Sequence, residues 1–353
     1  MRISAALALS ALLFFCTGCT VTNPYYDPQK SHHTKDGFRN NYLTESIGGA
    51  FLKWQWERIS EGLPKPPENG YQFPQATPEL AWLQQNRSVN SATWIGHATV
   101  LMQVKGINLI TDPVFSERTS PVQFIGPKRK VPLPITIAQL PHIDVVLISH
   151  NHYDHLDKDS VQQLNRQAGG SPLFLVPLGV KPWMAEAGIT NVQELDWWQQ
   201  TSVANLQIHF VPVQHWSARG PTDRYRTLWG GWMVRTATAV TPPFSFFFAG
   251  DTGYSKDFTD IQQRFESVDL ALLPVGAYAP RWFMHNQHID PDEAVRIHQE
   301  LKARRSIAIH WGTFELTDEP LDEPPKALAR ALTSAGIDAA QFSVLKHGQT
   351  VRF

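Results

Sequence analysis

The sequence predicts an α/β fold built from layered sheets and helices. With 353 residues, of which 42% are hydrophobic, the chain can bury a large core, which excludes a disordered protein. Short apolar runs rich in β-branched and aromatic residues alternate with stretches whose apolar residues recur at helical spacing. The sequence has no fixed-period repeat, which argues against solenoids and propellers. One compact α/β domain is the simplest interpretation.

The expected elements follow from these two periodicities. Strands are predicted where apolar runs of about five residues end at polar or glycine-containing loops, at residues 99–104, 107–111, 145–149, 173–176, 207–212, 245–249, 270–274 and 306–310. Helices are predicted where apolar residues are spaced three and four apart, at residues 160–167, 291–303 and 325–335.

The first 19 residues indicate an export signal. A short positive start at Met1-Arg2 precedes an apolar run too short to span a bilayer, and small residues follow it. Gly18-Cys19 resembles the bacterial lipobox, in which the cysteine becomes the lipidated first residue of the mature protein. We therefore expect an exported protein of the cell envelope, anchored as an outer-membrane lipoprotein. The sequence does not indicate which side of the outer membrane it faces. Cys16 and Cys19 are the only cysteines, so the remainder of the chain has no thiol.

Residues 20–79 are expected to form a tether and an N-terminal extension, followed by the main domain over 80–353. Residues 20–39 are polar and lack apolar periodicity, so His32-His33 is interpreted as solvated linker. Residues 43–59 could form an amphipathic helix that lies on a membrane or packs on the domain, and packing is favoured. Proline and glycine over 62–70 indicate a connector.

The charge balance makes a nucleic-acid partner unexpected. The chain has 31 Lys and Arg against 32 Asp and Glu, a formal net charge of -1. Without a long-range positive field, any phosphate must be bound through local charge, which a metal could supply. The oligomeric state is left open.

The most informative segment is Ser149-His150-Asn151-His152-Tyr153-Asp154-His155, which follows the apolar run 144–148. Neutral imidazole nitrogens and ionised carboxylate oxygens are ligands that first-row divalent metals prefer, and His150, His152 and Asp154 alternate so that they can project from one side of an extended turn. His155 then faces elsewhere, which makes a second metal possible. A polar turn with accidental histidines is the weaker interpretation, because such turns favour Gly, Asn, Asp and Ser.

Three further candidate ligands each stand where an apolar run ends, and they are His215, Asp251 and His310. Ligands in α/β folds gather at the carboxyl ends of strands, so these side chains are expected to meet the histidine-rich segment. Each residue alone could be a buried histidine or a turn aspartate. Their joint occurrence favours a metal site.

At these residues the chain resembles the metallo-β-lactamase superfamily, whose signature His-x-His-x-Asp-His is present at 150–155. The resemblance implies a four-layer αββα sandwich. It implies one metal held by His150, His152 and His215, a second held by Asp154, His155 and His310, and Asp251 bridging the two. The bridging aspartate is typical of phosphodiesterases and other hydrolases of this superfamily, whereas many β-lactamases have a cysteine in the second-metal shell.

Within the superfamily, the chain resembles the N-acyl-phosphatidylethanolamine-hydrolysing phospholipase D family from about Trp94 to Gly348. The resemblance is carried by the segments at 94–99, 111–116, 126–129, 195–198, 250–254, 281–284, 287–291 and 310–314. It implies two zinc ions, with iron or manganese as alternatives, and a phospholipid substrate met at a membrane surface. The reaction implied is hydrolysis to an N-acylethanolamine and phosphatidic acid by a water whose pKa the metals lower from 15.7 to about 7.

Asp154, Asp251 and His288 are the candidate catalytic residues. Asp154 would serve as ligand and orient the water, and the resemblance places His288 beside the site, where it could contact the phosphate or assist the leaving group. His288 could instead be only a residue at a helix start. His97 and Asp112 are expected to hydrogen-bond the ligands.

Two other functions stay open at this stage. The same centre could hydrolyse a lactone, a β-lactam or a small phosphodiester, because the fold does not fix the substrate. Alternatively, the protein could be a lipid-anchored envelope protein without enzymatic activity.

Overall fold

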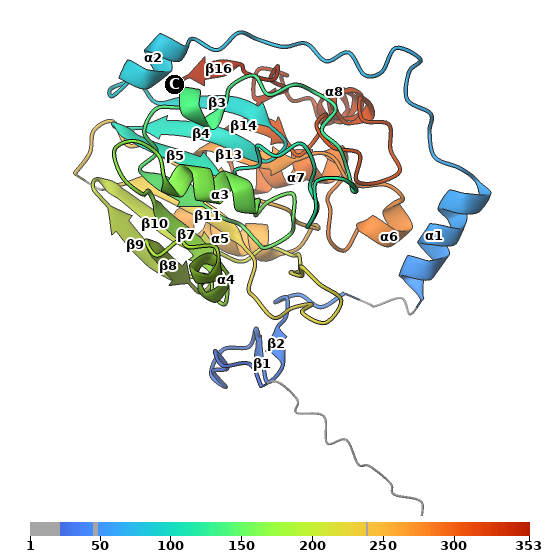
Figure 1. Ribbon diagram of the computed structural model, residues 1–353. Helices are drawn as coiled ribbons and strands as arrows, with labels where there is room; N and C mark the ends of the chain where they lie inside the picture. Colours follow the sequence, from blue (N-terminus) through green and yellow to red (C-terminus); the bar gives the residue numbers. More distant parts are fainter. Residues whose placement is uncertain (1–21, 45–48, 238) are drawn as a thin grey trace, which may run out of the picture.

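The computed structural model describes residues 22–44, 49–237 and 239–353 and consists of two facing β-sheets with helices outside them (Figure 1). The expected export signal lies outside these residues. Two seven-stranded sheets have the orders β16-β3-β4-β5-β6-β7-β8 and β15-β14-β13-β12-β11-β10-β9. This arrangement confirms the predicted α/β sandwich.

The first sheet combines antiparallel and parallel strands. β16 pairs with β3, β3 with β4 and β4 with β5 in antiparallel fashion, whereas β5 to β8 are parallel. Its strands are β3 Ser91–Gly96, β4 Thr99–Val104, β5 Ile107–Thr111, β6 Val145–Leu147, β7 Leu173–Pro177, β8 Val192–Leu195 and β16 Thr350–Arg352.

The second sheet has the same size and is antiparallel from β9 to β12 and parallel from β12 to β15. Its strands are β9 Gln200–Val203, β10 Leu206–Val211, β11 Gly231–Thr236, β12 Ser245–Phe248, β13 Val268–Pro274, β14 Ala303–Ile309 and β15 Phe342–Ser343. The eight predicted strands are all present, with ends shifted by up to three residues. The six other strands of the two sheets, β3, β8, β9, β11, β15 and β16, were not predicted.

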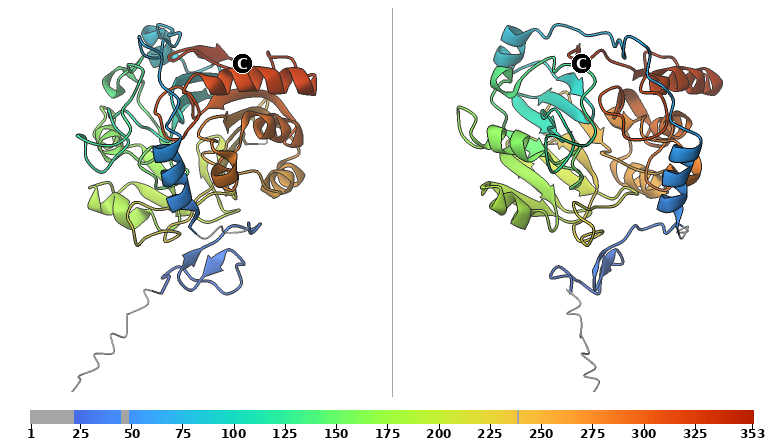
Figure 2. Two further views of the ribbon diagram at one scale, coloured as in Figure 1. Left: turned by 90° about the vertical axis from the view of Figure 1, so that its right-hand side faces the viewer. Right: turned by 45° about the vertical axis from the view of Figure 1, so that its right-hand side comes forward.

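Helices cover the outer faces of both sheets, as the two views of Figure 2 show. α3 Lys158–Asn165 and α4 Lys181–Glu186 belong to the first half, and α5 Asp257–Phe265, α7 Pro291–Glu300 and α8 Glu323–Ala335 to the second. Short elements lie around them: α2 Leu80–Gln85, η1 Ile137–Gln139 and α6 Arg281–Met284. The three predicted helices are α3, α7 and α8.

The core explains why the sheets face each other. In β4, Val100 and Met102 belong to the cluster between the sheets, whereas Leu101 belongs to a second cluster on the opposite face. The same alternation recurs in β6, where Val146 points away from Val145 and Leu147. Because successive side chains of a strand point to opposite faces, a strand that is apolar throughout must be covered on both sides.

The N-terminal segment differs from the expected tether. Within residues 22–44 a small hairpin forms, with β1 His33–Thr34 paired to β2 Gly37–Phe38. His32 and His33 are buried and lie 2.7 and 2.9 Å from the carboxylate of Asp196. Their interpretation as solvated linker is therefore wrong, because both rings contact the buried Asp196 carboxylate and His32 also stacks on Trp197.

Helix α1 Ala50–Ser60 packs on the domain through few side chains. Trp54 is buried, stacks on Phe283 of α6 and donates a hydrogen bond from Nε1 to Asp318 at 2.7 Å. The outward face is apolar instead of polar, with exposed fractions of 73% for Leu52, 67% for Trp56 and 78% for Ile59. Packing on the domain, as expected, thus accounts for only one face of this helix.

Among the described residues, no helix is long and apolar enough to cross a membrane.

Candidate metal centre

The histidine-rich loop is held at the carboxyl end of β6 by close backbone packing. Ser149 donates from its backbone N–H to Asp112 Oδ1 at 2.7 Å, and its Oγ is also within hydrogen-bond distance of that carboxylate. A Cβ on Gly250 would lie 2.5 Å from the Cβ of Ser149, so the loops after β6 and β12 can approach this closely only because residue 250 is glycine. His150 and Asp251 are thereby brought together.

A first group of three imidazoles comes from two loops. His150 Nε2 lies 2.8 Å from His152 Nδ1, and His215 Nε2 lies 3.3 Å from the same atom. His150 and His215 are buried. These three ring nitrogens converge and form a group that could hold a metal ion.

A second group surrounds Asp154. Its Oδ2 lies 3.4 Å from His155 Nε2 and 3.4 Å from His310 Nε2. His97 Nε2 lies 3.0 Å from the same oxygen. These four side chains also form a group that could hold a metal ion.

Asp251 lies between the two groups. Its Oδ2 is 3.2 Å from His155 Nε2 and 3.9 Å from His215 Nε2, and its Oδ1 is 3.1 Å from His310 Nε2. All seven side chains predicted as metal ligands are therefore close together, although they come from four separate loops.

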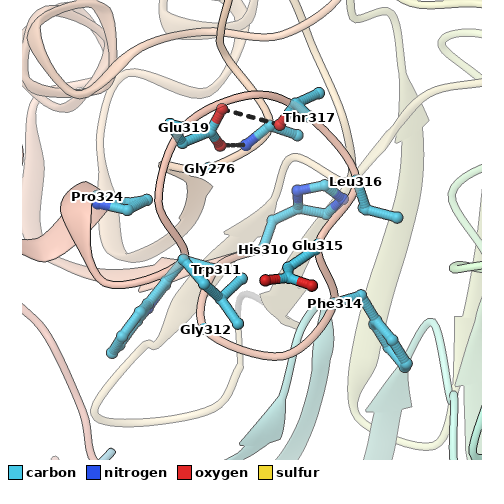
Figure 3. Close-up of a pocket in the computed structure, with 12 residues that line it drawn as sticks. Gly276, His310, Trp311, Gly312, Phe314, Glu315, Leu316, Thr317, Glu319 and Pro324 are labelled. Atoms are coloured by element: carbon cyan, nitrogen blue, oxygen red, sulfur yellow. Dashed lines mark hydrogen bonds between the residues drawn. The ribbon is translucent and has the colours of Figure 1, made fainter. Parts of the chain in front are cut away.

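His310 reaches the site from a tightly held turn after β14. Figure 3 shows its ring beside the turn that continues to Glu319, whose carboxylate accepts hydrogen bonds from Ala277 N and Thr317 Oγ1. A Cβ on Gly276 would lie 2.3 Å from the carbonyl oxygen of His310, so this approach requires glycine.

The electrostatics of the first group suit metal coordination. Burial lowers the pKa of His152 to about 4, and burial together with neighbouring imidazoles holds the pKa of His150 well below its usual value. Burial likewise keeps the pKa of His215 well below its usual range. These imidazoles are thus neutral at pH 7, the form that donates a lone pair to a metal.

In the second group the nearby carboxylates, and not burial, decide the protonation of the imidazoles. Burial opposes ionisation of Asp251, yet His155 and His310 hold its pKa well below the usual value. Despite burial, the Asp251 and Asp154 carboxylates raise the pKa of His310 to about 9. Without another cation, the carboxylates keep protons on these imidazoles.

Unpartnered polar atoms test whether the residues fit a metal. His155 Nε2, Asp251 Oδ1 and His288 Nδ1 are buried and make no hydrogen bond, although the first two lie within ion-pair distance of Asp251 Oδ2 and His310 Nε2. Buried polar groups are normally satisfied, and each left unsatisfied costs about 1–3 kcal/mol. Bound divalent cations would satisfy such atoms, so the donor set fits a metal centre.

Outer hydrogen bonds orient the inner side chains. The expected contacts of His97 with Asp154 and of Asp112 with His155 are both present, at 3.0 and 2.6 Å. The sequence did not reveal that the backbone carbonyl of Gln287 lies 2.9 Å from His215 Nδ1. In the segment around Gln287, the sequence pointed only to the neighbouring His288 as a candidate site residue.

His288 has its ring at the site. Its Nδ1 is 3.8 Å from Asp251 Oδ2, and its backbone carbonyl accepts a hydrogen bond from Arg281 at 2.6 Å. Helix α7 is capped by Asp290, whose side chain accepts from Glu293 N. The residue that caps the start of α7 is therefore Asp290, and not His288.

Comparisons with known proteins agree on a family. The model of the beta-lactamase superfamily domain matches residues 107–311. The N-acyl-phosphatidylethanolamine-hydrolyzing phospholipase D 1 of Caenorhabditis elegans is 42% identical over 244 residues, which cover 66% of this chain and 67% of that protein. The mitochondrial enzyme of the same name from Saccharomyces cerevisiae is 39% identical over 242 residues, which cover 67% of this chain and 50% of that protein.

Among solved structures, the isothiocyanate hydrolase from Delia radicum gut bacteria superposes with a TM-score of 0.58 at 21% identity. The match covers 74% of this chain and 99% of that one. At this identity the likeness concerns the fold alone.

Proposed function

The chain belongs to the beta-lactamase superfamily and, within it, to the N-acyl-phosphatidylethanolamine-hydrolysing phospholipase D family, and from this premise we propose its reaction. As a metal-dependent hydrolase, it cleaves a phosphodiester on a dinuclear centre. The substrate is N-acyl-phosphatidylethanolamine, and the products are an N-acylethanolamine and phosphatidic acid. The observation that carries the proposal is the position of Asp251 between two groups of metal-binding side chains.

One ion would be held by His150, His152 and His215, and the other by Asp154, His155 and His310. Asp251 would be a ligand of both ions. Zinc is proposed from the family resemblance and because it accepts nitrogen and oxygen ligands. When bound, two such cations lower the pKa of water and neutralise the non-bridging oxygens of a phosphodiester.

Side chains of the protein would orient the water and the substrate phosphate. Asp154 is held by His97, so its carboxylate has a fixed direction from which to orient a water. His288 has a buried and unpartnered Nδ1 at the same place, where it would contact the substrate phosphate. Burial lowers the pKa of His288 to about 4, so the ring is neutral at pH 7 and can donate or accept one hydrogen bond.

The outward face of α1 supports a substrate that resides in a lipid surface. Leu52, Trp56 and Ile59 are spaced four and three residues apart, so they lie on one face of the helix. Trp282 of α6 donates from Nε1 to Glu57 at 3.1 Å, so the helix is fixed next to the segment that carries His288. We propose that this face meets the membrane, and that an exported, lipid-anchored chain is held there through Cys19.

The test is a substrate panel on the purified, metal-loaded protein. N-acyl-phosphatidylethanolamine in mixed micelles is compared with nitrocefin, an acyl-homoserine lactone and bis-p-nitrophenyl phosphate, with elemental analysis of the same preparation. We expect lipid turnover to exceed the others and two metal ions per chain. Turnover of the lactone or β-lactam without lipid turnover would reject the proposed substrate.

A further inference from the structure

The N-terminal segment reaches the metal centre through Asn40. Its Nδ2 donates to the backbone oxygen of His215 at 3.0 Å, and its Oδ1 accepts from the backbone N–H of His215 at 3.1 Å. The same oxygen accepts from Trp229 Nε1 at 3.0 Å. One amide thus satisfies both main-chain polar groups of a candidate ligand that lies 175 residues away in sequence.

His215 needs such support because it lies in a loop, four residues beyond the end of β10 at Val211. Its Nδ1 is fixed by the carbonyl of Gln287, which leaves Nε2 facing His152. A ring is oriented only when its backbone is also fixed, and Asn40 supplies that second constraint. Partners that orient a metal-binding histidine contribute strongly to metal affinity.

Asn40 is itself held from both sides. Before it, the backbone N–H of Phe38 donates to the carbonyl of Tyr225 at 2.9 Å, and the Phe38 side chain is buried as part of the larger hydrophobic cluster. After it, Asn41 donates to Asp257 at 2.9 Å and Tyr42 donates to Asp260.

A second anchor fixes the start of the segment. The Asp196 carboxylate accepts a hydrogen bond from Lys30 Nζ at 2.6 Å and receives both His32 and His33. Figure 1 shows the hairpin of β1 and β2 below the sandwich. The segment therefore packs against the domain through specific contacts, and Asn40 is the residue through which it reaches the candidate centre.

We propose that residues 22–42 complete the metal centre and that Asn40 is a positioning residue for His215. This inference rests on the proposed metal assignment and adds a part of the chain that precedes the family-matched region, which begins at residue 107. Asn40 touches neither substrate nor metal. It acts by presenting the His215 ring to the ion shared with His150 and His152.

The experiment compares full-length Asn40→Ala with Asn69→Ala, a matched control that removes an exposed amide outside this segment. Metal-free protein is titrated with Zn²⁺ against a chromophoric chelator, and Co²⁺ spectra report the ligand geometry. For Asn40→Ala we expect one of the two sites to weaken by about 10–100-fold, with an altered Co²⁺ spectrum. The other site and both sites of Asn69→Ala should match the wild type.

A second variant separates positioning from folding. Asn40→Asp keeps the acceptor for the N–H groups of His215 and Trp229 but loses the donor to the His215 carbonyl, so its Zn²⁺ affinity should fall between wild type and Asn40→Ala. Excess Zn²⁺ should restore the turnover of both Asn40 variants.

Three results would overturn the inference: wild-type Zn²⁺ affinity in Asn40→Ala, equal losses in Asn40→Ala and Asn69→Ala, or turnover that excess Zn²⁺ leaves impaired. Failure of the proposed function looks different, because the wild type itself would then fail to bind two ions or to hydrolyse the lipid.

Discussion

Nδ1 of His155 lies 2.6 Å from Oδ2 of Asp112, and both side chains are fully buried. This contact decides which ring nitrogen of His155 faces the centre, because Nε2 is then directed toward Asp154 and Asp251. Burial raises the pKa of Asp112, while His155 and Ser149 act against that rise. Asp112, which is not itself a predicted ligand, thus orients a ligand of the second candidate metal site.

The first prediction concerns this pair. Asp112→Asn keeps the shape of the side chain but removes the charge that orients His155, so metal affinity should fall by about 10–100-fold. Competition with a chelator measures the loss. Asp159→Asn on the exposed side of α3 is the matched control and should bind metal like the wild type. Unchanged affinity in Asp112→Asn would show that His155 is oriented without it.

The second prediction concerns Asp251. Asp251→Asn removes the negative charge between the two groups, and we expect kcat to drop by about 10²–10³-fold or more, the scale seen when one charge-stabilising group is lost. Steady-state turnover and far-UV circular dichroism measure activity and folding. Asp292→Asn, exposed in the first turn of α7, serves as control. A folded Asp251→Asn variant with wild-type turnover would remove Asp251 from the site.

The third prediction tests the lipid-facing role of α1. Replacing Leu52, Trp56 and Ile59 with Ser should reduce turnover of lipid in vesicles by about tenfold or more, because burying one such side chain contributes about 1.5–3 kcal/mol. Turnover of soluble bis-p-nitrophenyl phosphate should not change, since the three side chains are exposed. Val344→Ser alters an exposed apolar residue elsewhere and should leave both rates unchanged. Equal losses on both substrates would contradict the membrane role.

The fourth prediction is a pH dependence of the metal-free protein. Burial lowers the pKa of His97 to about 3 and of His152 to about 4, whereas imidazoles in the unfolded chain titrate near 6.5. Between pH 6.5 and about 4 the unfolded state therefore binds more protons, so the free energy of unfolding should fall as the pH falls. His310, with its pKa raised to about 9, acts oppositely: its contribution is present below 6.5 and lost as the pH rises through 9.

Chemical denaturation in a chelator, from pH 4.5 to 9, measures this profile. His97→Gln should flatten the acid side, whereas His285→Gln at an exposed position should not. A profile that is flat between pH 4.5 and 6.5 in the wild type would contradict the buried, neutral state of these rings.

The sequence predicted most of the candidate centre because the chemistry is local to strand ends. His150 to His155 are contiguous, and His215, Asp251 and His310 each follow an apolar run, so residue type and position pointed to the same edge of the fold. The backbone carbonyl of Gln287 and the amide of Asn40 could not be found this way. A carbonyl carries no residue-type signal, and Asn40 contacts a residue that lies 175 positions away in sequence.

The missed elements have similar causes. β3 is buried along its whole length yet contains Ser91 and Thr93, so it lacks the continuous apolar run that marks a strand buried on both faces. His32-His33 was assigned to linker because polar residues without periodicity usually are. Its burial depends on Asp196, a partner that local pattern cannot reveal.

The last prediction tests whether the N-terminal segment is fitted as closely as the contacts indicate. A Cβ on Gly37 would lie 2.2 Å from the backbone oxygen of Tyr225, far inside contact distance, and that backbone cannot easily move. Gly37→Ala should therefore displace β2, destabilise the domain by about 1–3 kcal/mol and weaken zinc binding together with the loss of the Asn40 contact.

Limited proteolysis of residues 22–42, thermal unfolding and chelator competition measure these effects. Gly220→Ala is the matched control, because its Cβ would meet nothing closer than Asp223 Oδ1 at 3.7 Å. Gly37→Ala with a protease-resistant N-terminus and unchanged zinc affinity would mean that the segment tolerates displacement, and that its contact with Tyr225 does not hold Asn40 in place. Loss of both protease protection and zinc affinity in Gly37→Ala, with neither loss in Gly220→Ala, would tie the small hairpin to the metal centre.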